Sequence, residues 1–162
     1  MATPFSLPQN AKIVNALSPA TDAAGRTGAY VSLKNYHKAF LVCQVLQGNA
    51  ATVAVALSQA TAVAGTGAKA TTVVMPIWSN LDVSTNDTLV ERTAAISYTT
   101  DAALKTKTVV IEVDPARLDV AGGFDCVAPV TGASNVANLT SAMWILTPAR
   151  YAESTPPSAV VD

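Results

Sequence analysis

Short apolar runs that alternate with a period of two, separated by turn-forming residues, constrain this chain more than any other feature. In residues 38–46, Ala39, Leu41, Cys43 and Val45 share one face, and Phe40, Val42 and Leu46 share the other with Gln44. In residues 50–57, Val53, Val55 and Leu57 alternate with small or polar residues. No long window places apolar residues at helical spacing, so the pattern predicts strands.

Turn residues between these runs predict how the strands are connected. Gln47, Gly48 and Asn49 separate the first two runs, which indicates a hairpin. Further strands are expected at residues 71–78, as two pieces within 88–99, and at 107–113, 124–130 and 138–146. Pro76 makes the first of these an edge strand or a bulged one. The last is apolar on both faces, which predicts a central strand.

Seven or eight short strands of this kind predict an all-β fold. We expect an antiparallel β-sandwich, with a jelly roll as the leading topology and another sandwich or a barrel as alternatives. The domain organisation expected is an extended N-terminal arm over residues 1–24, a sandwich over 25–152 and a C-terminal tail over 153–162. Asp114 before Pro115 is a good cap for one helical turn.

Composition excludes several classes of partner. The net charge is −1 with no basic stripe, which argues against nucleic acid. No apolar segment reaches membrane-spanning length, and the first ten residues lack the pattern of a signal peptide, so we expect folding in the cytosol. Half of the residues are apolar and only 13% are charged. These values suit a domain that buries much of its outside against copies of itself or a larger partner.

Apolar and aromatic residues near the N-terminus are the candidate partner contacts. The arm carries four apolar residues, which lie either on a neighbouring molecule or on the chain's own domain. The stretch from Gly25 to Val45 adds tyrosines as packing or contact aromatics. The candidate contact residues are therefore Phe5, Leu7, Ile13, Val14, Tyr30 and Tyr36.

Reactive centres find little support in the sequence. A jelly-roll metal site needs several imidazoles, and His37 is the sole histidine. No G-x-S-x-G nucleophile elbow is present, and the glycines at 25–28 and 65–67 lack the context of a phosphate loop, so we expect turns there. Cys43 and Cys126 stand in apolar strands, where a thiol is a small buried hydrophobe.

Three acidic residues have two alternative interpretations. Asp114, Asp119 and Asp125 could converge on calcium, although their spacing matches no known loop. Capping and turn roles are the favoured alternative. We therefore expect no catalytic, cofactor-binding or metal-binding residues, and we expect that the protein is not an enzyme.

Three sequence segments resemble a known family. The first is TDAAGRTGAYVSLKNYHK, from Thr21 to Lys38, and the second is PIWSNLD, from Pro76 to Asp82. The third begins with VVIEVDP, from Val109 to Pro115, passes through Gly123, Phe124 and Asp125, and ends with ILTPARY, from Ile145 to Tyr151. These segments resemble small virion proteins of tailed bacteriophages, of the capsid decoration or cement type.

The resemblance implies a structural virion protein with a jelly-roll fold and no cofactor. It would bind the major capsid protein on the capsid exterior, stabilise contacts between neighbouring capsid proteins and assemble as a homotrimer. Alternatives are a head–tail joining protein, a tail protein or a receptor-binding head fibre. A carbohydrate-binding jelly roll is a further alternative, for which Trp78 and Trp144 would be the exposed aromatics.

Overall fold

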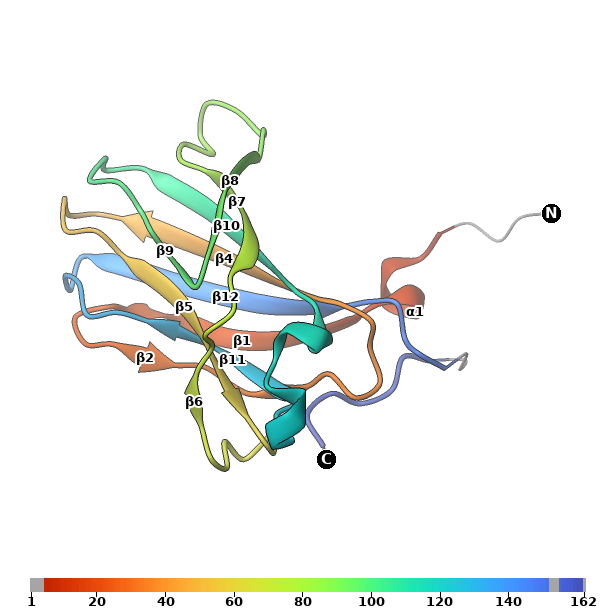
Figure 1. The fold of residues 1–162 in the computed structure, drawn as a ribbon. Coiled ribbons are helices and arrows are strands. Elements are labelled where there is room, and N and C mark those ends of the chain that lie inside the picture. Colours follow the sequence, from red (N-terminus) through yellow and green to blue (C-terminus); the bar gives the residue numbers. More distant parts are fainter. Residues whose placement is uncertain (1–4, 152–154, 162) are drawn as a thin grey trace.

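The computed structural model describes residues 5–151 and 155–161. Within these ranges the regular structure is almost entirely β (Figure 1). The elements are α1 (Leu7–Asn10), β1 (Lys12–Thr21), β2 (Arg26–Thr27), β3 (Val31–Ser32), β4 (Ala39–Gln47), β5 (Ala54–Ala60), β6 (Lys69–Ala70), β7 (Met75–Asn80), β8 (Val90–Ala95), β9 (Ser97–Thr99), β10 (Thr106–Val113), the 3-10 turns η1 (Pro115–Arg117) and η2 (Val120–Gly122), β11 (Cys126–Thr131) and β12 (Asn138–Leu146).

Two antiparallel sheets pack face to face. The first, sheet A, has the order β1-β12-β4-β10-β7-β8, and the second, sheet B, has the order β2-β11-β5-β6, with β3 paired to β11 and β9 to β5. Consecutive long strands lie mostly in opposite sheets, and the last strand returns between β1 and β4. This alternation between sheets is the jelly-roll arrangement, with β7 and β8 extending sheet A. The predicted fold class is confirmed.

The core lies between the sheets, where the period-two patterns place the larger apolar side chains. Strands β4, β5, β10 and β12 each send alternate residues inward. Trp144 and Tyr36 are the largest fully buried side chains of the described residues. The inward set includes Leu41, Cys43, Val45, Val55, Leu57, Val109, Ile111, Trp144 and Leu146, all buried.

The predicted hairpin between the first two long strands is wrong. Both strands exist, but β4 belongs to sheet A and β5 to sheet B. Side-chain amides bind the backbone of the connection between them. Gln47 Nε2 donates to Ala51 O over 3.2 Å, and Asn138 Nδ2 donates to the same oxygen over 2.7 Å. These bonds satisfy loop backbone groups that a tight turn would pair internally.

The N-terminal boundary also needs correction. Residues 12–21, predicted as part of an arm, form edge strand β1, which pairs with β12 from Lys12↔Leu146 to Thr21↔Leu139. Of the two alternatives, the packing of this segment on its own domain is the one observed. Residues 1–4 lie outside the described residues, and α1 buries none of its side chains.

The C-terminal segment, which the sequence predicts as a tail, is docked on the domain over residues 155–161. Ala159 is fully buried, and its carbonyl accepts a hydrogen bond from Ser32 N. The Tyr36 hydroxyl donates to Pro157 O, and Lys12 Nζ donates to Pro156 O over 3.3 Å. Residues 155–161 therefore complete the sandwich near the end at which β1 begins. The predicted boundary at residues 152–153 falls outside the described residues.

Other local predictions are confirmed. The register of β7 against β8 shifts between Met75 and Ile77, so Pro76 marks a bulge, and β12 is a central strand. Asp114 caps η1 by accepting from Ala116 N. The described residues contain no helix long and apolar enough to cross a membrane.

Candidate interaction surface

The outward side of sheet A carries bulky apolar residues where a sandwich usually presents polar ones. Successive side chains of a strand point to opposite sides of the sheet, so the residues between the core positions point outward. We call this surface the apolar face; it comprises Ile13 and Asn15 of β1, Phe40, Val42, Gln44 and Leu46 of β4, Trp78 of β7, Thr106, Thr108, Val110 and Glu112 of β10, and Leu139, Ser141, Met143 and Ile145 of β12.

Strand register places these side chains in continuous rows across the sheet. The longest row runs from Asn15 through Met143, Val42, Val110 and Trp78 to Glu91 on edge strand β8. Directly opposed residues in adjacent strands touch, so each row is a contiguous strip. The parallel rows are Ile13–Ile145–Phe40–Glu112, Ser141–Gln44–Thr108 and Leu139–Leu46–Thr106.

Several large apolar side chains of this face have a high exposed fraction. Ile13 is 47% exposed, Met143 46% and Leu46 51%, while Val42 and Trp78 are half-buried by their neighbours in the sheet. The outer face of an antiparallel sheet is ordinarily solvated and polar. A contiguous set of large apolar side chains on such a face is typical of a surface that another molecule covers.

A shallow groove of about 370 Å³ crosses this face between β1 and β4. Its floor contains Ala142, and Met143, Ile13 and Val42 line it together with the polar Gln44 and Ser141. The register shifts of β1, between Asn15 and Leu17 and between Leu17 and Ala20, lie beside this groove.

Charge is confined to the margin of the face. Within the set defined above, Glu112 is the charged member; it lies 3.5 Å from Lys38 Nζ and accepts from Trp78 Nε1 over 3.1 Å. The centre is therefore apolar with neutral amides and hydroxyls, which is the composition of an interface core.

A second apolar projection stands at the end of the sandwich where the chain begins. Phe5 is 78% exposed and Leu7 41% exposed, and both belong to the turn around α1 that extends beyond the sheets (Figure 1). Together with Ile13 these residues are the exposed members of the predicted contact set.

The remaining predicted contacts are internal. Tyr36 is fully buried, so its prediction as a partner contact is wrong. Tyr30 is half-buried, with its hydroxyl 2.8 Å from Ser58 Oγ on sheet B, and Val14 packs against the core. Trp144, a predicted glycan-binding aromatic, is also buried, and this removes it from any groove.

The acidic residues considered for calcium point to separate partners. Asp119 lies 2.5 Å from Lys69 Nζ and caps η2, Asp114 caps η1, and Asp125 lies 3.5 Å from Lys34 Nζ. In the part of the chain that the structure describes, no group of three or more His, Cys, Asp or Glu side chains is placed to hold a metal ion.

Neither cysteine is placed for nucleophilic chemistry. Cys43 and Cys126 are buried and are not joined in a disulfide. Burial raises the pKa of the Cys43 thiol to about 12, so the thiol is protonated at neutral pH. His37, the sole histidine, is exposed.

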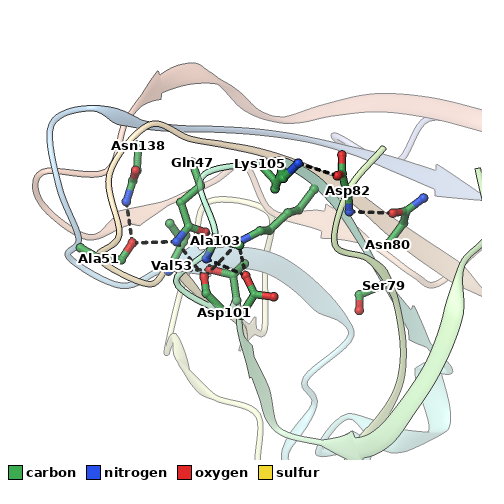
Figure 2. A network of polar contacts seen from close by, with 12 residues as sticks. Gln47, Ala51, Val53, Ser79, Asn80, Asp82, Asp101, Ala103, Lys105 and Asn138 are labelled. Carbon is green, nitrogen blue, oxygen red and sulfur yellow. Dashed lines mark hydrogen bonds and ion pairs between the residues drawn. The ribbon is translucent and has the colours of Figure 1, made fainter. Parts of the chain in front are cut away.

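A buried lysine, Lys107, lies at the end of the sandwich opposite α1. Its partners Gln47 and Asp101 are shown in Figure 2. Lys107 Nζ donates to Gln47 Oε1 over 2.7 Å, to Asp101 Oδ1 over 2.6 Å and to Asp101 O over 2.9 Å. Gln47 also accepts from Thr100 Oγ1 over 2.9 Å. The ammonium group thus has three protein acceptors. With Gln47, whose amide donates to Ala51 O and Asp101 O, it ties the loops at 48–53 and 100–105 together.

Acid sensitivity follows from the carboxylates in these contacts. The hydrogen bond from Lys107 lowers the pKa of Asp101, hydrogen bonds from Ser84 and Lys105 lower the pKa of Asp82 to about 2, and the bond from Lys69 lowers the pKa of Asp119. Depressed carboxyl pKa values add stability that is complete above the unfolded-state pKa of about 4 and is lost as the pH falls through the folded-state values. We expect the free energy of unfolding, measured by urea titration, to decline below about pH 4.

The Asp101→Asn variant should lose less of its free energy of unfolding between about pH 4 and about pH 2 than the wild-type chain does. An equal loss in both proteins would contradict a contribution from the Asp101 carboxylate.

The apolar face is not predicted as a site by the sequence analysis, although one signal for it is present. Residues 138–146 and 39–46 are apolar on both faces, which by itself predicts central strands. The same pattern also indicates a sheet whose outer side is covered.

Comparisons with known proteins give distant likenesses. No protein-family model matches the sequence, and no curated protein matches it. Among solved structures, the SPBc2 prophage-derived protein YomS is similar with a TM-score of 0.49 and 10% identity, over 90% of this chain and 100% of that one. A structure described as "CBM4 structure and function" has a TM-score of 0.31 and 10% identity, over 85% and 70%. A Desmodium yellow mottle tymovirus structure has a TM-score of 0.16 and 10% identity, over 96% and 91%.

Proposed function

We propose that this chain is a structural protein of a bacteriophage particle, a decoration or cement protein that binds the outside of the capsid. In this role it stabilises contacts between major capsid proteins and carries out no catalysis. The observation that carries the proposal is the exposed apolar surface of the chain, at the α1 turn and on the apolar face, because a domain that works alone in water has no use for such surfaces.

The proposed role needs a rigid framework and surfaces to be covered. Jelly-roll sheets supply the framework, and their rigidity keeps the ordering cost of binding small. A cement protein that binds the assembled shell better than free subunits stabilises the shell by mass action. Repetition over a symmetric lattice allows modest contacts to act together.

The turn around α1 is the proposed contact with the shell. Phe5 and Leu7 are exposed, extend from one end of the sandwich and use no buried position of their own domain. An apolar anchor of this kind fits a pocket between capsid subunits, where an aromatic side chain contributes most of the binding energy.

Capsid binding by the purified chain tests the function directly. The chain is mixed with capsids that lack it, and bound protein is quantified after sedimentation. We expect saturable binding, with a copy number that scales with the number of capsomers, and greater resistance of the capsids to heat. Saturation at one vertex would indicate a head–tail joining protein, and absence of binding would contradict the proposal.

Substitution of the anchor gives a second test. Phe5→Ser combined with Leu7→Ser should weaken capsid binding at least about tenfold, because truncating a buried aromatic anchor costs more than about 1.4 kcal/mol. Val136→Ser is the matched control, since Val136 is 65% exposed in the loop before β12, at the far end of that strand from α1. Equal binding by both variants would remove the turn from the contact.

A further inference from the structure

We infer that the apolar face is the contact between two copies of this chain, which pack these faces against each other around a two-fold axis. The inference deepens the proposed function, on which it rests for the premise that this face is covered in the particle. It assigns the face to self-association and leaves the α1 turn free to bind the shell.

The distribution of charge favours a second copy as the occupant. A surface that meets itself across a two-fold axis brings like charges together, and such pairs are costly when they lose water. The rows avoid this cost over β1, β12 and β4, where they contain no charged side chain. Glu91 lies at the far end of the longest row, on edge strand β8, and Glu112 lies at the margin and is already partnered by Lys38.

The polar members of the face are also compatible with self-pairing. Asn15 and Gln44 carry amides that both donate and accept hydrogen bonds, and Ser141 and Thr108 carry hydroxyls that do the same. An identical surface therefore presents suitable partners for each group. Met143 is unbranched and adaptable, so the copy opposite can place it in the groove beside β1.

The size of the face suits a small dimer interface. Its rows cross β1, β12, β4, β10 and β7. At about 4.8 Å between strands and about 6.8 Å between alternate residues, the face measures roughly 500 Å² in plan. A standard interface buries about 800 Å² on each partner and the smaller specific interfaces bury less than about 600 Å², so the face alone corresponds to an interface at the small end of this range. Sheets packed in this way lie about 10 Å apart, as within a single sandwich.

Alternative apolar sites on the described surface are not arranged as a sheet face. Val73, Leu104, Val120 and Val136 are exposed, but they lie in connections between strands. A ring of three subunits needs two different complementary surfaces, whereas a two-fold pair needs one self-complementary surface. The apolar face meets the second requirement.

Mass measurement of the full chain without capsids tests the inference. Light scattering after gel filtration should give a mass near twice 16.6 kDa at micromolar concentration. Met143→Glu should raise the dissociation constant at least about a hundredfold, because each copy would bury an unpaired carboxylate. Leu104→Glu is the matched control: Leu104 is 61% exposed off the face, and Met143 is 46% exposed on it. Thermal melts of the monomeric forms should agree, since both side chains are exposed in the single chain.

The outcomes separate this inference from the proposed function. A dimer that Met143→Glu disrupts and Leu104→Glu preserves supports the inference, whether or not the chain binds capsids. A monomer, a trimer, or a dimer insensitive to Met143→Glu overturns it, even where wild-type protein saturates capsids. Capsid binding by the wild-type chain remains the separate measure of the proposed function.

Discussion

Deletion of residues 1–21 is expected to prevent the domain from folding. The deletion removes β1, which pairs with β12 over its whole length and buries Ala16 and Leu17 in the core. It also uncovers the edge of β12 beside Trp144. Loss of a buried leucine costs about 2–5 kcal/mol, and the lost ladder and opened edge add to it. The total is comparable with the roughly 5–15 kcal/mol that stabilises a typical domain.

Deletion of residues 1–10 is the matched control. This change removes α1, which has no buried side chain, together with the bond from Thr147 Oγ1 to Asn10 O and the bond from Ala11 N to Leu7 O. We expect a loss of about 1 kcal/mol in the free energy of unfolding and an intact sandwich. Circular dichroism and urea titration distinguish the two truncations. A cooperative unfolding transition after removal of residues 1–21 would show that β1 is dispensable.

Strand positions could be predicted from the sequence because they depend on local alternation. The predicted strands at residues 38–46, 107–113 and 138–146 correspond closely to β4, β10 and β12. Each has β-branched or aliphatic residues at every second position, and burial of one face enforces that period. The cap at Asp114 and the bulge at Pro76 are likewise set by single residues and their immediate neighbours.

Strand pairing could not be predicted in the same way. The connection between β4 and β5 contains good hairpin residues, yet its backbone is bound by Asn138, which is 87 positions from Ala51. Such bonds form only after distant segments meet. β1 was not predicted as a strand because its sequence lacks strict alternation. Its register shifts between Asn15 and Leu17 and between Leu17 and Ala20.

The apolar face could not be predicted from the sequence because it depends on the register in which the strands of sheet A pair. Met143, Val42 and Val110 are far apart in sequence, and each alone is an ordinary exposed or half-buried residue. Pairing of β12, β4 and β10 brings them into one row. The sequence could indicate only that the chain has more apolar surface than its core requires; the location of that surface follows from strand order.

Asp22→Ala is expected to lower the free energy of unfolding by about 3–5 kcal/mol. The Asp22 carboxylate is fully buried and accepts from Arg26 Nε over 3.2 Å, from Arg26 Nη2 over 3.1 Å and from Thr131 Oγ1 over 3.1 Å, and it accepts also from Thr140 Oγ1. It therefore joins the end of β1 to strands of both sheets. Alanine would leave two buried hydroxyls and a guanidinium group without this acceptor.

Through Arg26, the Asp22→Ala substitution should also destabilise edge strand β1. Its guanidinium also donates to Ser18 O over 3.0 Å, Ala20 O over 3.2 Å and Thr140 O over 2.8 Å, and the first two are carbonyls of β1 near its register shifts. Loss of Asp22 removes the charge that orients this group. The irregular half of β1 should then become more accessible to hydrogen exchange than the regular half at residues 12–15.

A double-mutant cycle identifies the source of the loss. Asp22→Ala and Arg26→Met, made singly and together, should give a coupling energy of at least about 1 kcal/mol, because each single change leaves the other charge without its partner. Asp87→Ala is the surface control, with an expected change within about 0.5 kcal/mol. Urea titration at pH 7 measures all four variants. Additive losses from Asp22→Ala and Arg26→Met would show that the carboxylate acts through the threonine hydroxyls and not through the ion pair.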